Sequence, residues 1–154
     1  MAKYQGLAAL LSSFALLGAC PKQPFKQQFK AETIALVRVK GHLSKKTNYF
    51  YGLQLQIIKF YKGSIARSQV RAFLPGAEPS LPIKRYKYDT TLVVSMHKGA
   101  NGRFILAKCF DQSALLEQKG YVYGCLKPGC EKLPYEQKMP FRGFERWLAK
   151  QLKK

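Results

Sequence analysis

The hydrophobic pattern of residues 49–61 restricts the fold of this chain more than any other segment. Between Leu53 and Ile57, apolar side chains alternate with glutamines, which is the two-residue period of a β-strand with one buried face. After Ile57 the apolar series moves by one position and continues through Ile58 and Phe60. A one-residue change of phase is what a β-bulge produces, and small barrels close at such bends. The segment therefore predicts a long, bent strand in a small closed sheet.

Four further segments have strand composition. Each is short, rich in β-branched or aromatic residues, and bounded by glycine, proline or polar turn residues. They are Glu32–Gly41, Gln69–Leu74, Tyr88–Met96 and Arg103–Phe110. Gly99 and Gly102 predict a turn that makes the last two strands antiparallel neighbours. The Pro- and Gly-containing stretch 75–82 predicts a surface loop.

Two helices complete the expected fold. Asp111 is suited to cap a short helix through Glu117, which Gly120 would end. Within residues 139–154, apolar side chains recur at three- to four-residue spacing, which predicts a basic amphipathic C-terminal helix. We expect its apolar face to pack on the sheet, and contact of its basic face with a membrane is the alternative. Residues 22–30, interrupted by a proline, predict an extended lead-in rather than a helix.

These elements predict one fold class. It is mainly β: a five-stranded OB-like closed barrel with a short capping helix and a C-terminal helix. We expect the barrel domain to span residues 20–138 and the basic helix to occupy residues 139–154.

Residues 1–19 have the layout of an export signal, in which Lys3 precedes an apolar run that ends in Leu17-Gly18-Ala19 before Cys20. This ending resembles a lipobox, so we expect cleavage before Cys20 and diacylation of its sulfur. Cleavage by ordinary signal peptidase to give a secreted or periplasmic form is one alternative, and an uncleaved anchor is another. The expected location is the cell envelope, with the protein attached to the membrane by lipid.

The chain is strongly basic, with 27 Lys and Arg against 8 Asp and Glu and a formal net charge of +19 at pH 7. Such a charge concentrates polyanions near the surface, and salt weakens the effect. Outside the cytoplasm the accessible polyanions are anionic glycans and lipid headgroups, whereas nucleic acid is less accessible. The candidate polyanion-binding residues are Lys84, Arg85, Lys87, Lys150, Lys153 and Lys154. Tyr86 and Tyr88 interleave with the first three, which indicates a strand with one solvated face or, alternatively, a stacking platform.

The cysteines indicate disulfide chemistry. In an oxidising compartment, Cys125 and Cys130 are expected to close a small loop. Cys109 would pair with Cys20 if that sulfur is free, and would stay a buried thiol if Cys20 is acylated. A zinc site that joins the near pair to Cys109 and His97 is a further alternative, although no second C-x-x-C motif accompanies it. We therefore expect no metal and no cofactor.

No catalytic motif is present in the sequence. It contains no H-E-x-x-H, G-x-S-x-G or glycine-rich phosphate loop, and its acidic residues are isolated. His42 and His97 lie in polar, turn-like sequence and are expected to be solvated loop residues. We therefore predict a binding protein rather than an enzyme.

Four short motifs follow one another between Cys20 and Cys130. They are Phe29 with Ala31-Glu32 before the first strand, Ile57–Gly63, Gly102–Phe110, and Tyr121–Cys125. In order and spacing they resemble the F-C-x-A-D, I-K-x-F-K-G, G-x-x-x-I-x-x-C and Y-x-x-G-C motifs of the netrin-like domain of tissue inhibitors of metalloproteinases. The resemblance implies an OB-type barrel.

The resemblance also implies a mechanism, in which the amino group and carbonyl of an N-terminal cysteine bind a protease's catalytic zinc. In this chain an unacylated Cys20 would supply them, and Pro21 would be the inhibitory edge that enters the specificity pocket. We predict an exported, lipid-anchored binding protein with a protein partner, and a metalloendopeptidase as the candidate target. The alternative is a basic envelope module that binds anionic glycans or lipids.

Overall fold

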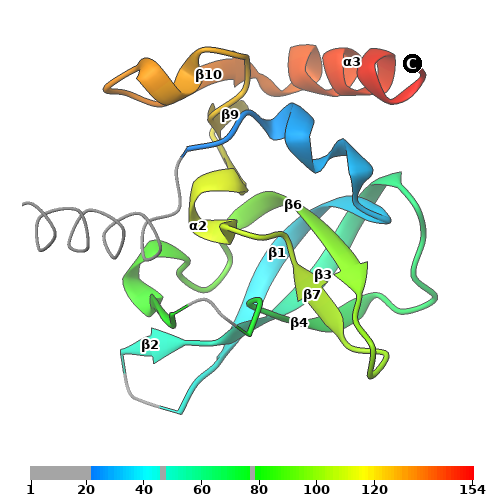
Figure 1. Ribbon diagram of the computed structural model, residues 1–154, viewed down its shortest axis with the longest axis vertical. Coiled ribbons are helices and arrows are strands. Elements are labelled where there is room, and N and C mark those ends of the chain that lie inside the picture. Colours follow the sequence, from blue (N-terminus) through cyan, green and yellow to red (C-terminus); the bar gives the residue numbers. More distant parts are fainter. Residues whose placement is uncertain (1–21, 46–47, 77–78) are drawn as a thin grey trace, which may run out of the picture.

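The computed structural model describes residues 22–45, 48–76 and 79–154, and its centre is a closed five-stranded barrel (Figure 1). The barrel strands are β1 (Thr33–Leu43), β3 (Gly52–Lys62), β4 (Gln69–Phe73), β6 (Thr91–Lys98) and β7 (Phe104–Leu106). They follow one another in the order β1-β3-β4-β7-β6, and β6 pairs with β1 to close the barrel. β4 and β7 run parallel, and the other neighbours are antiparallel. The predicted fold class, a mainly β protein with a five-stranded OB-like barrel, is confirmed.

The predicted bulge lies in β3. Val37 of β1 pairs with Ile57 and the preceding Leu36 pairs with Lys59, so Ile58 is the extra residue. Two further register shifts lie along the same ladder. Bulges increase strand twist and bending, which lets β1 pair with β3 on one side and with β6 on the other.

Strand β1 is buried on both faces. Ala35 and Val37 point into the barrel and pack with alternate residues of β3, β4 and β6. Ile34 and Leu36 point outward into a second apolar cluster on the outside of the barrel. This side of the barrel therefore needs an outer layer to cover it.

Three additional strands and two helical segments form that layer. The strands are β8 (Leu115–Gln118), β9 (Tyr121–Gly124) and β10 (Gln137–Pro140), which extend the sheet from β6. The helical segments are η1 (Phe25–Lys30), a turn of 3₁₀ helix, and the C-terminal helix α3 (Phe141–Leu152). In Figure 1, η1 lies directly beside α3 at one end of the molecule.

The predicted capping helix is shorter than expected. Helix α2 spans only Phe110–Ser113, and the strand β8 follows it, so the prediction of a helix through Glu117 is wrong. Lys119 and Gly120 have φ angles of 51° and 82°, so the glycine forms the β8–β9 hairpin turn rather than a helix end.

Two segments predicted to be extended are 3₁₀ turns. The predicted lead-in forms η1 because Phe25 is fully buried and its N–H donates to the Cys125 carbonyl at 2.9 Å. The segment η2 (Ile83–Arg85) interrupts the predicted Lys84–Tyr88 alternation, and Tyr86 is buried in the barrel core. Burial raises the pKa of Tyr86 to about 12. Neither the predicted strand nor a stacking platform forms there.

The C-terminal helix is amphipathic, as predicted, and its apolar face packs on the protein. Phe144 and Leu148 are fully buried in the outer cluster. The Phe144 ring lies near Phe25, Tyr61 and Trp147, with centroid distances of 6.2, 6.4 and 5.9 Å. Among the described residues, no helix is long and apolar enough to cross a membrane.

The disulfide predicted between Cys125 and Cys130 is present, with their Cα atoms 5.3 Å apart. It closes the start of the connection between β9 and β10, next to the 3₁₀ turn η3 (Cys130–Lys132). Cys109, which precedes α2, is also disulfide-bonded. The expectations for residues 1–21, including the export signal, Cys20 and Pro21, lie outside the described residues.

Candidate ligand-binding groove

A groove crosses one end of the barrel, where the β1–β3 connection, the end of β4 and the β6–β7 turn meet. Its wider part is a cleft of about 780 Å³. The described residues that line it are Lys45, Tyr49, Tyr51, Phe73, Leu74, Pro75, Gly76, Ser80, Asn101, Arg103 and Ile105. A cleft of this size, with apolar walls and a few polar groups, is typical of ligand sites.

An aromatic pair lies in the cleft. The rings of Tyr51 and Phe73 are nearly parallel, with centroids 6.2 Å apart and planes 24° apart. The guanidinium carbon of Arg103 lies 5.1 Å from the Phe73 centroid, and the Lys45 Nζ lies 5.7 Å from the Tyr51 centroid. These are cation–π distances. The two rings therefore hold two positive charges at defined places over an apolar surface.

The barrel positions this pair through its main chain. The Tyr51 N–H donates to the Leu43 carbonyl at 2.8 Å, and the Tyr51 carbonyl accepts from the Leu74 N–H at 2.9 Å. The next residue, Gly52, pairs with Phe73. A Cβ on Gly52 would lie 3.3 Å from the Phe73 ring and 2.9 Å from a carbonyl oxygen of β4. Glycine at this position therefore leaves room for the Phe73 ring beside Tyr51.

A two-stranded sheet braces the loop beside the cleft. Strand β2 (Tyr49–Phe50) pairs with β5 (Leu81–Pro82), at the end of the stretch predicted to be a surface loop. Phe50 is fully buried, and its ring lies 5.9 Å from Tyr86 and 5.6 Å from His42. His42 also forms a hydrogen bond with the Tyr86 carbonyl. The prediction of a solvated loop residue is wrong for His42, while His97 is exposed but lies on β6.

The groove continues along the outer face of β3 and β4. Gln54 pairs there with Arg71, and Arg67, Arg71 and Arg103 line a second hollow of about 420 Å³. Phe73 and Arg103 border both hollows, so the two hollows are neighbours on the surface. Side chains alternate between the two faces of a strand, so Leu53 and Leu55 point into the core. The amide of Gln54 and the guanidinium of Arg71 therefore point outward.

The groove is cationic along its described length. Lys45, Arg67, Arg71 and Arg103 are exposed, and none of the described lining residues is acidic. The ion pairs found in the described part of the chain are Lys40–Asp89, Lys59–Glu145 and Arg85–Asp111. No carboxylate in that part of the chain neutralises a groove cation, so an anionic group that enters the groove meets unpaired positive charge.

The residues predicted to bind polyanions lie elsewhere, in two separate groups. Lys84, Arg85 and Lys87 lie on or next to η2, whereas Lys150 lies in the last turn of α3 and Lys153 and Lys154 follow it. Figure 1 shows η2 and the end of α3 far apart. Arg85 also pairs with Asp111, which also accepts a hydrogen bond from the Tyr86 hydroxyl. The structure does not gather the six residues into one site.

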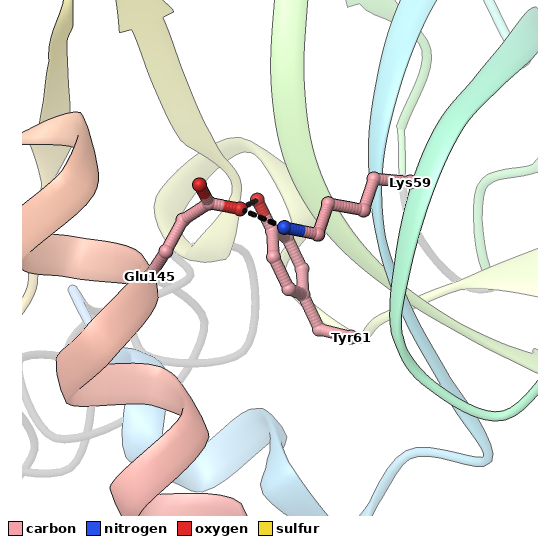
Figure 2. Close-up of polar contacts among 3 residues, drawn as sticks. All are labelled: Lys59, Tyr61 and Glu145. Atoms are coloured by element: carbon pink, nitrogen blue, oxygen red, sulfur yellow. Dashed lines mark hydrogen bonds and ion pairs between the residues drawn. The ribbon is translucent and has the colours of Figure 1, made fainter.

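A separate polar cluster ties α3 to the barrel. Figure 2 shows Glu145 of α3 facing Lys59 and Tyr61 of β3. One carboxylate oxygen accepts hydrogen bonds from the Lys59 Nζ and the Tyr61 hydroxyl, each at 2.8 Å. Partial burial alone would raise the pKa of Glu145, but these two donors lower it below its ordinary value. Burial and the bond to Glu145 raise the pKa of Tyr61. At neutral pH the Glu145 carboxylate is therefore ionised, and its hydrogen bonds to Lys59 and Tyr61 attach α3 to β3.

The alternative prediction of a zinc site is wrong for Cys125 and Cys130, which form a disulfide. Cys125, Cys130 and Glu131 form a group of potential metal ligands in the described part of the chain. Because the two sulfurs are bonded to each other, neither is a thiolate that could bind zinc.

Comparisons with protein-family models, with curated proteins and with solved structures each found no match. The resemblance to the netrin-like domain therefore stays a prediction, and the groove is the feature of this chain that indicates a function.

Proposed function

We propose that this protein is a non-enzymatic binding module that captures an anionic glycan in the groove of its barrel. One observation carries the proposal: an aromatic pair holds Lys45 and Arg103 in a cleft of about 780 Å³, and the cationic surface continues from it. Export to the cell envelope, as the sequence predicts, would place this groove where such polymers are accessible.

The groove offers three kinds of contact that suit an anionic sugar chain. Arg71 and Arg103 can bind carboxylate or sulfate groups in bidentate geometry. Gln54 and Asn101 can exchange hydrogen bonds with hydroxyl groups. Tyr51 and Phe73 provide apolar surface for the C–H faces of a sugar ring. The five-stranded OB-like barrel is also a scaffold that binds polymers through this strand face and these loops.

The test is a titration with heparin, a sulfated glycan, at two salt concentrations. We expect binding that weakens steeply with salt, because each neutralised anionic group releases a counterion. The variant Arg71→Ala/Arg103→Ala should bind at least about tenfold more weakly, since each charge-assisted hydrogen bond contributes about 1.5–3 kcal/mol. Its binding should also depend less on salt.

The matched control is Lys84→Ala/Lys87→Ala, which removes the same charge away from the groove. We expect nearly wild-type affinity from it. Equal losses in the two variants would mean that net charge alone attracts the glycan, and the proposal would then be wrong. Phe73→Ala should weaken binding of heparin more than binding of polyglutamate, which has charges but no rings.

Inhibition of a zinc metalloendopeptidase is the second candidate. One observation favours it: the chain after Pro21 is fixed, because Phe25 is buried and bonded to the Cys125 carbonyl, and the Lys22 Nζ donates to the Leu133 carbonyl at 3.2 Å. A fixed N-terminal segment is what an inhibitor that enters a protease cleft requires. Titration of a zinc endopeptidase with the processed protein tests it. Salt-insensitive inhibition would support this function, and unchanged protease activity would exclude it.

A further inference from the structure

The outward face of α3 is a continuous basic stripe. Arg142, Arg146, Lys150 and Lys153 are exposed, and their spacing of four, four and three residues places them on one side of the helix. Phe144 and Leu148 occupy the opposite, buried side. The core therefore uses the apolar face of the helix, and its basic face is left without a protein partner in the described part of the chain.

No acid on α3 neutralises this stripe. Glu145, the acidic residue within the helix, points toward β3, where Lys59 and Tyr61 bind its carboxylate (Figure 2). The neighbouring segment η1 adds the exposed Lys26 and Lys30. The two segments lie side by side, since the rings of Phe29 and Trp147 are 5.9 Å apart.

Trp147 gives this surface an apolar component. Its side chain is only partly buried, and together with Arg146, Ala149, Lys150 and Lys153 it lines a shallow hollow of about 590 Å³. An indole bordered by basic side chains is the combination that favours the boundary between lipid headgroups and acyl chains.

We propose that α3 docks on an anionic phospholipid membrane, with its axis along the surface and Trp147 at the headgroup level. We infer an anionic membrane as the partner from charge complementarity, because the stripe is cationic throughout and anionic leaflets attract such clusters. This site is independent of the glycan groove. Figure 1 shows α3 at one end of the long axis and β4 with the β6–β7 turn at the other. A docked helix therefore leaves the groove facing away from the membrane.

The test is sedimentation of the unacylated processed protein, which begins at Cys20, with vesicles that contain phosphatidylglycerol, compared with vesicles of phosphatidylcholine alone. We expect binding to the anionic vesicles to exceed binding to the neutral ones. The variant Arg146→Gln/Lys150→Gln should bind the anionic vesicles about 25-fold more weakly, at about fivefold for each basic residue lost. Both positions are exposed, so the fold should be unaffected, and far-ultraviolet circular dichroism checks this.

Two controls separate this site from net charge and from the groove. Lys84→Gln/Lys87→Gln removes the same charge from another surface, and Arg71→Ala/Arg103→Ala alters the groove; both should bind vesicles nearly as well as wild type. Trp147 is the one tryptophan in the chain, so its fluorescence reports on this site alone. Docking through α3 should shift its emission to shorter wavelength. Vesicle binding with unchanged emission, equal losses in all three variants, or no preference for anionic vesicles would each overturn the proposal.

Discussion

The structure makes Phe144 the residue on which the attachment of α3 depends most. Its side chain is fully buried, and it contacts η1 through Phe25, β3 through Tyr61 and its own helix through Trp147. Replacing a buried phenylalanine with alanine removes the burial energy of the ring and leaves a cavity, which together cost about 3–5 kcal/mol. We expect Phe144→Ala to lower the free energy of unfolding by about 4 kcal/mol, a large fraction of the typical total of roughly 5–15 kcal/mol.

The assay is urea denaturation followed by circular dichroism, and thermal unfolding should show a midpoint lowered by roughly 10 °C. Tyr135→Ala is a matched control, because Tyr135 is an aromatic residue with 63% of its surface exposed. Its replacement should change the free energy of unfolding by less than about 0.5 kcal/mol. A loss below about 1 kcal/mol in Phe144→Ala would mean that α3 is only loosely attached, and our account of the second apolar cluster would be refuted.

Three further predictions concern the same outer layer. Glu145 has a lowered pKa, so its ion pair contributes stability that is present above the unfolded-state pKa, near 4.5, and is lost as pH falls through the folded-state pKa. Glu145→Gln should therefore flatten the acid limb of a plot of stability against pH. An unchanged acid limb would contradict this. Cys125→Ser/Cys130→Ser opens a small loop, so denaturation should show a loss of about 2 kcal/mol, and no loss would show that the loop is fixed without the bond. Gly143→Ala should raise the thermal midpoint and stabilise α3 by about 1 kcal/mol, because the nearest atom to its new Cβ lies 3.9 Å away, and a lower midpoint would argue against this packing.

The parts of the fold that the sequence predicted well are those that local pattern decides. The phase change at Ile57-Ile58 predicted the bulge correctly, since the side of a strand that faces the core depends on its own two-residue period. The C-terminal helix was predictable for the same reason, because its apolar residues repeat with the helical period.

The errors occur where distant contacts override local preference. Leu115 and Glu117 have high helix propensity, yet pairing with β6 on one side and β9 on the other holds them in a strand. Gly120 has the left-handed conformation that both a helix end and a hairpin turn use. A glycine at this position in the sequence therefore could not show which of the two structures forms. Tyr86 lies among basic residues in the sequence, but the barrel interior buries its ring beside Phe50 and Phe110.

The groove was missed because no single segment contains it. Tyr51 and Arg103 come from two connections of the barrel and Phe73 from the end of β4, and only strand pairing brings them together. The net charge predicts a polyanionic partner as an alternative, and from charge alone that partner was expected at basic runs such as Lys84–Lys87, whereas the groove that we propose lies elsewhere. One local signal pointed to the groove: Gly52 begins the long strand β3, and glycine in a strand often marks a close approach.

The most direct test of the central claim is a titration of the isotope-labelled protein with a short heparin oligosaccharide, followed residue by residue through its backbone amide resonances. Our account predicts that the largest shifts lie at Tyr51, Arg71 and Phe73 and in the turn at residues 101–103, with small changes on α3 and η2. Large shifts confined to η2 or to the end of α3, with the groove unaffected, would contradict it.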